Sequence, residues 1–182
     1  MPKDVTRRKA VAAAGSSLFF AVAPGMVAGV VPWWLTGWET GSPPWWSPLR
    51  VLGALVLVAA TVLLVQAFVR FVVEGLGTPA PAAPTAHLVV GGLYRYVRNP
   101  MYLAVGGAIV GQALLLSRPV LLVYAAAISV ANSAFVHWYE EPTLRRQFGA
   151  DYDTYRQAVP GWLPRLHPRS VSGISRHSEI SR

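Results

Sequence analysis

Residues 92–102 read Gly-Leu-Tyr-Arg-Tyr-Val-Arg-Asn-Pro-Met-Tyr, and this polar, aromatic and basic stretch lies directly before an apolar run. Asn99 and Pro100 are typical of a helix start, with asparagine at the N-cap and proline at the first helical position. Arg98 is thereby placed at the N-terminus of an apolar helix. Because the free N–H groups of a helix N-terminus favour negative charge, the stretch predicts a site for an anionic ligand group. The alternative is an interfacial belt of a membrane protein, where aromatic and basic residues also gather.

The composition indicates a small membrane protein. Of 182 residues, 53% are hydrophobic and only 13% are charged, whereas about 25% are charged in soluble domains. A net charge of +8 could attract nucleic acid, but the basic residues flank apolar runs, so membrane topology explains them better and we predict no nucleic-acid partner. The chain has no cysteine, which excludes a disulfide and a cysteine nucleophile. His87 and His137 lack metal-ligand spacing, so no metal site is predicted.

Four apolar runs follow one another at about residues 10–31, 49–73, 100–117 and 120–138. Because a membrane-spanning helix takes about 20 apolar residues, we predict an all-α membrane protein with about four transmembrane helices. Arg118 and Pro119 leave room only for a tight turn, so the last two runs are expected to form an antiparallel hairpin. Three glycines of the third run would allow close helix packing, namely Gly106, Gly107 and Gly111.

Glu140, Glu141 and Pro142 follow the fourth run, and we expect the helix to stop there because proline disfavours helical geometry in the preceding residue. Beyond it, apolar side chains recur every three or four residues, which predicts a cytoplasmic C-terminal amphipathic helix interrupted at Gly149. These side chains are Leu144, Phe148, Tyr152 and Tyr155. Earlier in the chain, the Trp-rich loop of residues 32–48 is typical of a membrane interface.

The basic residues also predict an orientation. Most Lys and Arg lie in the N-terminal segment, in residues 74–100 and in the C-terminal segment, while the opposite loops hold only Arg50 and Arg118. By the positive-inside rule, both termini and the central stretch are expected on the cytoplasmic side of a bacterial plasma membrane. Residues 1–164 are expected to form one integral-membrane domain, and the basic, Ser-rich residues 165–182 a disordered tail.

The predicted hairpin brings two polar blocks to the same level of the membrane. Arg98 can hold a carboxylate in a bidentate pair, and Glu140 and Glu141 can accept hydrogen bonds from hydroxyl or ammonium groups. Tyrosine rings tolerate a nearby cation. The pattern indicates a pocket for a ligand that carries a carboxylate together with hydroxyl or ammonium groups. A purely structural cluster of ion pairs is the alternative.

Both blocks resemble motifs of the isoprenylcysteine carboxyl methyltransferase and phospholipid methyltransferase family. The first is Gly92-x-Tyr94-x-x-x-Arg98-Asn99-Pro100-x-Tyr102, and the second is Glu140-Glu141 with Leu144, Phe148-Gly149, Tyr152, Tyr155 and Val159-Pro160. The resemblance covers residues 75–164, about half of the chain. It implies an integral-membrane enzyme that uses S-adenosylmethionine. The implied cofactor-binding residues are Gly92, Tyr94, Arg98, Asn99, Pro100, Tyr102, Glu140 and Glu141. Of these, Arg98 and Glu141 are the expected catalytic residues.

Two positions depart from the family pattern. Asn99 stands where the family often has histidine, so a histidine base is excluded at this position. Gly161 follows Val159-Pro160 where the family has arginine, so one basic contact is missing. A carboxylate or thiolate acceptor needs no base, whereas an amine acceptor must lose a proton.

The resemblance implies methyl transfer from S-adenosylmethionine to a lipidic or small hydrophobic acceptor, a carboxylate, thiol or amine, at the cytoplasmic membrane face. One alternative is an NADPH-dependent membrane reductase of related fold, which would need a further basic cluster for the 2′-phosphate. Another is a non-catalytic membrane scaffold. The sequence identifies neither the acceptor nor the oligomeric state.

Overall fold

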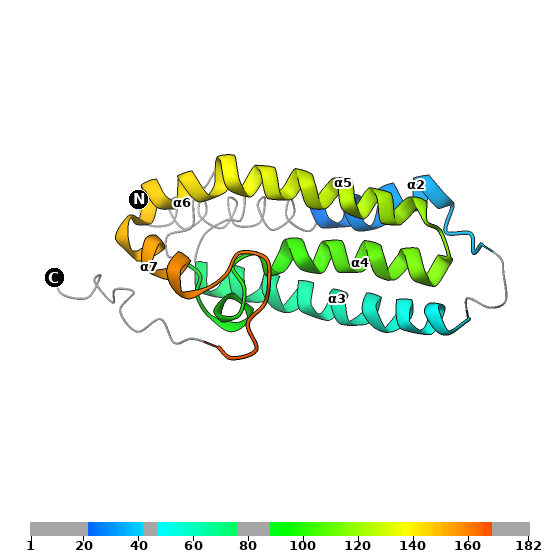
Figure 1. The fold of residues 1–182 in the computed structure, drawn as a ribbon, viewed down its shortest axis with the longest axis horizontal. Helices are drawn as coiled ribbons and strands as arrows, with labels where there is room; N and C mark the ends of the chain where they lie inside the picture. The colour runs from blue at the N-terminus through cyan, green and yellow to red at the C-terminus, as the bar shows by residue number, and fades with distance from the viewer. Residues whose placement is uncertain (1–21, 42–46, 76–87, 169–182) are drawn as a thin grey trace, which may run out of the picture.

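The computed structural model describes residues 22–41, 47–75 and 88–168, and within these ranges it is helical without a strand. Figure 1 shows an elongated bundle in which α3, α4 and α5 lie side by side, with α2 at one end and α7 at the other. The elements in order are η1 (Met26–Val30), α2 (Val31–Thr36), α3 (Ser47–Gly75), η3 (Gly92–Arg95), α4 (Pro100–Leu116), α5 (Val120–Phe135), η4 (Val136–Glu140), α6 (Glu141–Phe148) and α7 (Ala150–Ala158). The predicted all-α class is confirmed.

Two helices are long and apolar enough to cross a membrane, Pro48–Phe71 and Val120–Phe148. Their apolar side chains point outward: only 17% of the most apolar window of each helix is buried, and Val123 and Val130 are 71% and 70% exposed. Water would disfavour so much exposed apolar surface, and lipid would not. Such exposed apolar faces on long helices are typical of a membrane protein. The apolar helices Val22–Thr36 and Pro100–Leu116 are shorter, so four spans stay a prediction.

The first described apolar helix extends further than the sequence indicated. It continues to Thr36, whose hydroxyl donates to the Pro32 carbonyl at 2.7 Å. It ends at Gly37, which has a left-handed φ of 59°. Trp33 and Trp34, expected in a loop, therefore lie on the helix, where both remain exposed. The first half of the predicted 10–31 span lies outside the described residues.

The backbones of α3 and α4 are in direct contact. A Cβ atom added at Gly53 would lie 2.4 Å from the Leu115 nitrogen, and one added at Gly111 would lie 2.7 Å from the Leu57 nitrogen. No side chain fits at such distances, so both positions require glycine. Gly111 is thus confirmed as a close-packing residue, and Gly53 is its counterpart on α3.

The other two glycines of α4 face different neighbours. A Cβ atom on Gly107 would lie 3.3 Å from the Ala60 side chain, which is a tight contact on the α3 side. A Cβ atom on Gly106 would lie 3.9 Å from the Ser129 hydroxyl of α5, which is an ordinary contact. Close packing is therefore confirmed for Gly107, whereas Gly106 has room for a side chain.

A short turn joins α4 to α5 as predicted. Ser117 adopts a left-handed φ of 53°, and the N–H of Arg118 donates to the Ala113 carbonyl at 3.0 Å. Only residues 117–119 separate the helices, so they form the expected antiparallel hairpin.

The expected stop at residues 140–142 is wrong, because α5, η4 and α6 form one helix, Val120–Phe148. The element η4 is a π-type turn, and the N–H of Glu141 donates to the carbonyl of Val136, five residues back. Pro142 has no N–H to donate, and the wider turn directly before it accommodates its ring without a break. The preference against helical geometry before proline is thus overridden locally.

The C-terminal part contains two short helices, because Gly149, with a φ of 52°, separates α6 from α7 as expected. Tyr152 and Tyr155 are buried, and Leu144 and Phe148 pack against the same cluster. The apolar face of these helices therefore contacts the protein interior. The predicted placement on the membrane surface stays a prediction, and residues 169–182 of the predicted tail lie outside the described residues.

Replacing Gly111 by alanine should destabilise the protein, because the new Cβ atom would overlap the backbone of α3. We expect a loss of about 1–3 kcal/mol in the free energy of unfolding, as for other overpacked cores. Denaturant unfolding in detergent would measure it. Gly106→Ala is the matched control and should be neutral or slightly stabilising, since alanine favours helix. Equal stabilities of the two variants would contradict the proposed backbone contact.

Candidate active site

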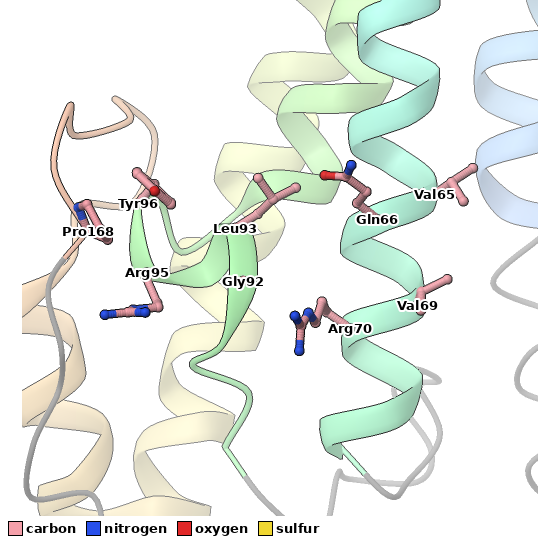
Figure 2. Close-up of a pocket in the computed structure, with 9 residues that line it drawn as sticks. All are labelled: Val65, Gln66, Val69, Arg70, Gly92, Leu93, Arg95, Tyr96 and Pro168. Atoms are coloured by element: carbon pink, nitrogen blue, oxygen red, sulfur yellow. The ribbon is translucent and has the colours of Figure 1, made fainter.

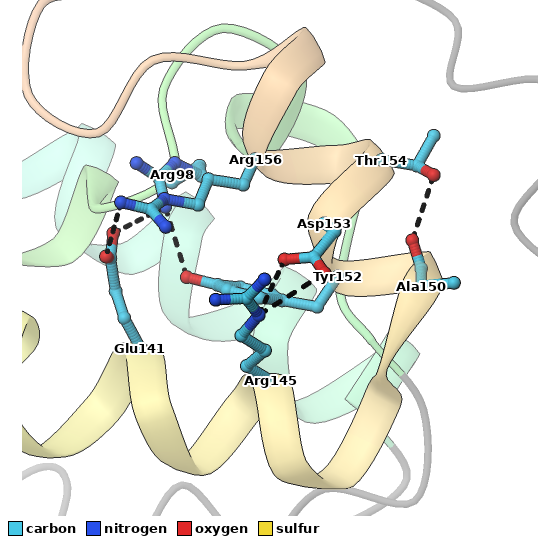
Figure 3. A network of polar contacts seen from close by, with 8 residues as sticks. All are labelled: Arg98, Glu141, Arg145, Ala150, Tyr152, Asp153, Thr154 and Arg156. Carbon is cyan, nitrogen blue, oxygen red and sulfur yellow. Dashed lines mark hydrogen bonds and ion pairs between the residues drawn. The ribbon is translucent and has the colours of Figure 1, made fainter.

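Arg98 is the centre of the polar cluster at one end of the bundle (Figure 3). Its Nη1 donates to Glu141 Oε1 at 2.6 Å and to the Tyr152 hydroxyl at 3.1 Å. Its Nε donates to the Val159 carbonyl at 3.0 Å, and its backbone N–H donates to the Pro160 carbonyl at 2.9 Å. A single side chain, with its own backbone, therefore connects the start of α4 to α6, α7 and the segment after α7.

Glu141 balances this charge. Its second oxygen, Oε2, lies 3.4 Å from Arg156 Nη2, so both carboxylate oxygens face a guanidinium group. The side chains of Arg98 and Glu141 are only 13% and 15% exposed. A pair removed from water this far is stable only while both partners are present. The structure thus brings Arg98 and Glu141 together, in the direct ion pair that the structural alternative described.

Glu140 takes part in a separate contact. The hydroxyl of Tyr102 donates to Glu140 Oε2 at 2.9 Å, and the Tyr102 ring lies against the Trp162 ring with centroids 6.3 Å apart. Arg98 and Tyr102, at the start of α4, therefore each contact one of the two consecutive glutamates at the end of η4 and the start of α6. The hairpin brings the two blocks together in the expected way.

Tyr94 lies in the hydrophobic core beneath this cluster. It is 6% exposed, and its carbonyl accepts a hydrogen bond from the Tyr155 hydroxyl at 2.8 Å. Burial raises the pKa of the Tyr155 hydroxyl, although the nearby Arg98 guanidinium opposes the shift. The phenol therefore stays protonated and keeps its donor role. The expected part of Tyr94 in cofactor binding stays a prediction.

Gly92 lies on the other side of η3 from Arg98's contacts, against Arg70 of α3. It has a left-handed φ of 55°, and a Cβ atom there would lie 3.0 Å from Arg70 Cγ. Glycine is needed both for the backbone conformation and for this approach. The structure gives Gly92 a role in the turn, and its expected role in cofactor binding stays a prediction.

Asn99 occupies the predicted N-cap position before Pro100, but its side chain makes no capping hydrogen bond. The residue is 7% exposed, and its Nδ2 has no hydrogen-bond partner in the described part of the chain. A buried N–H donor without a partner is costly, and a ligand acceptor would satisfy it. The asparagine thus serves the helix start by position and leaves its amide for another group.

Gly161 lies next to this amide. A Cβ atom on Gly161 would lie 3.2 Å from Arg98 Nη2 and 3.6 Å from Asn99 Nδ2. Arg98 Nη2 is also without a hydrogen bond among the described residues, because the hydrogen bonds of Arg98 use only Nη1, Nε and the backbone N–H. We call this pair of donor nitrogens beside Gly161, Arg98 Nη2 and Asn99 Nδ2, the donor recess. From the sequence we interpreted Gly161 only as the loss of a basic contact. Its approach to Arg98 could not be predicted from the local sequence.

These observations describe a membrane protein with a polar, donor-lined site at one end, and the comparisons give its family. The family model described as phospholipid methyltransferase matches residues 48–151, more than half of the chain. The chain therefore belongs to the phospholipid methyltransferase family, which confirms the predicted resemblance and the methyltransferase class. The match includes α3, the α4–α5 hairpin and both glutamates, and it ends before Tyr152 and Gly161.

A phosphatidylethanolamine N-methyltransferase of Phaeosphaeria nodorum (strain SN15) is 30% identical to this chain over 84 residues. The aligned part is 42% of this chain and 9% of the fungal protein, so the chain spans only a small part of that relative's length. No solved structure matches the chain.

Replacing Glu141 by glutamine should destabilise the protein, because Arg98 would keep a largely buried charge without its partner. We expect a loss of about 3 kcal/mol in the free energy of unfolding. The control is Asp153→Asn, which breaks the ion pair that Asp153 forms with Arg145 at 3.0 Å. The side chains of Arg145 and Asp153 are 62% and 35% exposed. That change should cost less than about 1 kcal/mol. Denaturant unfolding of both variants is the measurement, and equal losses would contradict the central role of Arg98–Glu141.

Proposed function

We propose that this protein transfers a methyl group from S-adenosylmethionine to a lipidic acceptor at the membrane surface. Family membership supports the reaction class, and the donor recess is the observation that carries the cofactor assignment. Arg98 Nη2 and Asn99 Nδ2 both lie near Gly161, and neither has a hydrogen-bond partner among the described residues. A carboxylate, such as that of the methionine part of the cofactor, has two oxygens to accept them.

The polar residues would then have distinct roles. Arg98 and Asn99 hold the cofactor carboxylate. Glu140 Oε2 accepts the hydrogen bond of the Tyr102 hydroxyl, whereas Oε1 has no hydrogen-bond partner among the described residues. Glu140 Oε1 can therefore accept a hydrogen bond from a ribose hydroxyl. Glu141 uses both oxygens on Arg98 and Arg156. We therefore assign Glu141 as a positioning residue that fixes Arg98, in place of the catalytic role that the sequence indicated.

Methyl transfer from S-adenosylmethionine needs little acid–base catalysis. S-adenosylmethionine supplies a methyl group on a leaving group that departs as a neutral thioether. The protein's contribution is to hold the acceptor in line and to exclude water, which can lower a barrier by about 7–11 kcal/mol in well-oriented systems. Asn99 cannot titrate near neutrality, so an amine acceptor would lose its proton to a group other than Asn99.

We propose a lipid amine as the acceptor. The relative from Phaeosphaeria nodorum is named for methylation of the nitrogen of phosphatidylethanolamine, and the exposed apolar faces of α3 and α5 support a site beside lipid. We also propose that the site faces the cytoplasm, because seven of the nine described arginines, all except Arg50 and Arg118, lie at this end of the bundle. A reductase is not favoured by the family match.

Asn99→Ala should weaken S-adenosylmethionine binding about tenfold while stability is retained, since the change removes no hydrogen bond of the ligand-free protein. Gly161→Val should abolish binding by filling the donor recess. Calorimetry on the detergent-purified protein measures both. Arg146→Ala is the control, because Arg146 is exposed and outside the recess. Arg98→Ala is a poorer test, since Arg98 also holds α6 and α7 in place.

Wild-type affinity in both recess variants would contradict the cofactor assignment. A folded wild type that binds NADPH and not S-adenosylmethionine would instead support the reductase alternative.

The acceptor can be tested with methyl-labelled S-adenosylmethionine and vesicles. We expect label to enter phosphatidylethanolamine and not phosphatidylcholine, whose nitrogen is already fully methylated. A prenylated cysteine analogue in the same vesicles tests a carboxylate acceptor. Label in that analogue alone would contradict the amine assignment and keep the methyltransferase assignment.

A further inference from the structure

Two leucines in the segment after α7 are almost fully exposed. Leu163 and Leu166 are 82% and 92% exposed, the highest values among the large hydrophobic side chains of the described residues. Neither belongs to a helix, and neither packs in the hydrophobic core clusters. They are therefore separate from the apolar faces of the long helices. Water disfavours two such neighbouring apolar side chains.

Contacts with the rest of the protein hold this segment in place. The N–H of Arg165 donates to the Tyr96 carbonyl at 3.1 Å. The Trp162 ring lies against the Tyr102 ring, with centroids 6.3 Å apart. Figure 2 shows Pro168 beside Tyr96, and both line the pocket between η3 and α3. The two leucines thus project from a segment whose backbone is attached to η3 and whose first residue is packed on α4.

The segment lies at the depth where a membrane-spanning helix would end. It is attached next to η3, and η3 packs on α3, since a Cβ atom on Gly92 would lie 3.0 Å from Arg70 Cγ. Arg70 is the second-last residue of the candidate span Pro48–Phe71. In Figure 1 the segment after α7, coloured orange to red, lies level with the last turns of α3 along the bundle axis. Acyl chains meet headgroups at the ends of such spans.

The residue types of the segment fit this depth. Trp162 and Arg165 alternate with Leu163 and Leu166, and Arg165 is exposed. Tryptophan rings and guanidinium groups are favoured among headgroups, while neighbouring leucines reach the acyl carbons. The apolar face of α6 and α7 is already used in the protein interior. Contact of the C-terminal part with the bilayer would therefore be made by the leucines after α7.

We propose that residues 162–166 insert into one leaflet of the bilayer, with Leu163 and Leu166 among the uppermost acyl carbons. The partner is the membrane surface and not a lipid bound in a pocket. The proposal requires α3 to span the membrane, and it does not depend on methyl transfer. Because Gly161 directly precedes the segment, insertion would hold the donor recess at the membrane surface.

Fluorescence quenching in vesicles tests the proposal. The chain contains no cysteine, so Leu163→Cys and Leu166→Cys each provide one site for a nitrobenzoxadiazole label. The labelled full chain is reconstituted in phosphatidylcholine vesicles that carry a spin label near either end of the acyl chain. We expect the label near the headgroup to quench both positions about twice as strongly as the deep label, since interfacial segments insert only about 5–10 Å.

Two matched positions serve as controls. Gln157→Cys, on the exposed face of α7, should show emission typical of water and quenching by iodide but not by lipid. Val130→Cys, which is 70% exposed within the candidate span Val120–Phe148, should be quenched more strongly by the deep label. Both leucines are nearly fully exposed, so their replacement should leave the helix content unchanged by circular dichroism. If one leucine variant fails to fold, the other decides.

Three results would overturn the proposal. Emission typical of water at both leucine positions would place the segment outside the bilayer. Blue-shifted emission without lipid quenching would show that protein covers the leucines. Equal lipid quenching at Gln157→Cys would assign the contact to the whole C-terminal part. No readout uses S-adenosylmethionine, so a failure of the proposed function leaves this test unaffected.

Discussion

The close approach of α3 and α4 at Gly53 and Gly111 determines where the polar residues meet. Because no side chain separates the two backbones there, α4 lies along α3 over its length, and its N-terminus comes to the end of α3 that carries Arg70. The short turn after α4 then returns α5 along the bundle to the same end. Both polar blocks thus depend on a contact that Gly53 and Gly111 make near the opposite end of α3 and α4.

A second local feature directs the glutamates. The π-type turn η4 lies directly before Glu141 and Pro142. The helix continues from this turn into α6 although Pro142 has no N–H to donate. Glu140 reaches Tyr102 while Glu141 reaches Arg98. Such turns are frequent at functional sites. Here the turn extends the last long helix past the apolar run, so that its acidic residues lie beside the start of α4.

Local signals in the sequence predicted much of this arrangement, as the α4–α5 hairpin and the Asn99-Pro100 helix start show. They misjudged Pro142, because the preference before proline is weaker than the geometry of the turn that precedes it. They also missed Gly161 and the approach of Arg70 to Gly92. Those depend on where distant segments pack, as when the N–H of Arg165 donates to the Tyr96 carbonyl at 3.1 Å and holds the last described segment on η3. Spacing along the chain carries no such information.

The contacts of Arg98 also bear on how its guanidinium group could select one ligand group. Its Nη1 and Nε donate hydrogen bonds to Glu141, Tyr152 and the Val159 carbonyl, so the guanidinium group cannot rotate toward lipid headgroups. Only Nη2 is left, and it faces Gly161 beside Asn99. A preorganised donor loses little freedom on binding and accepts a group only at that position.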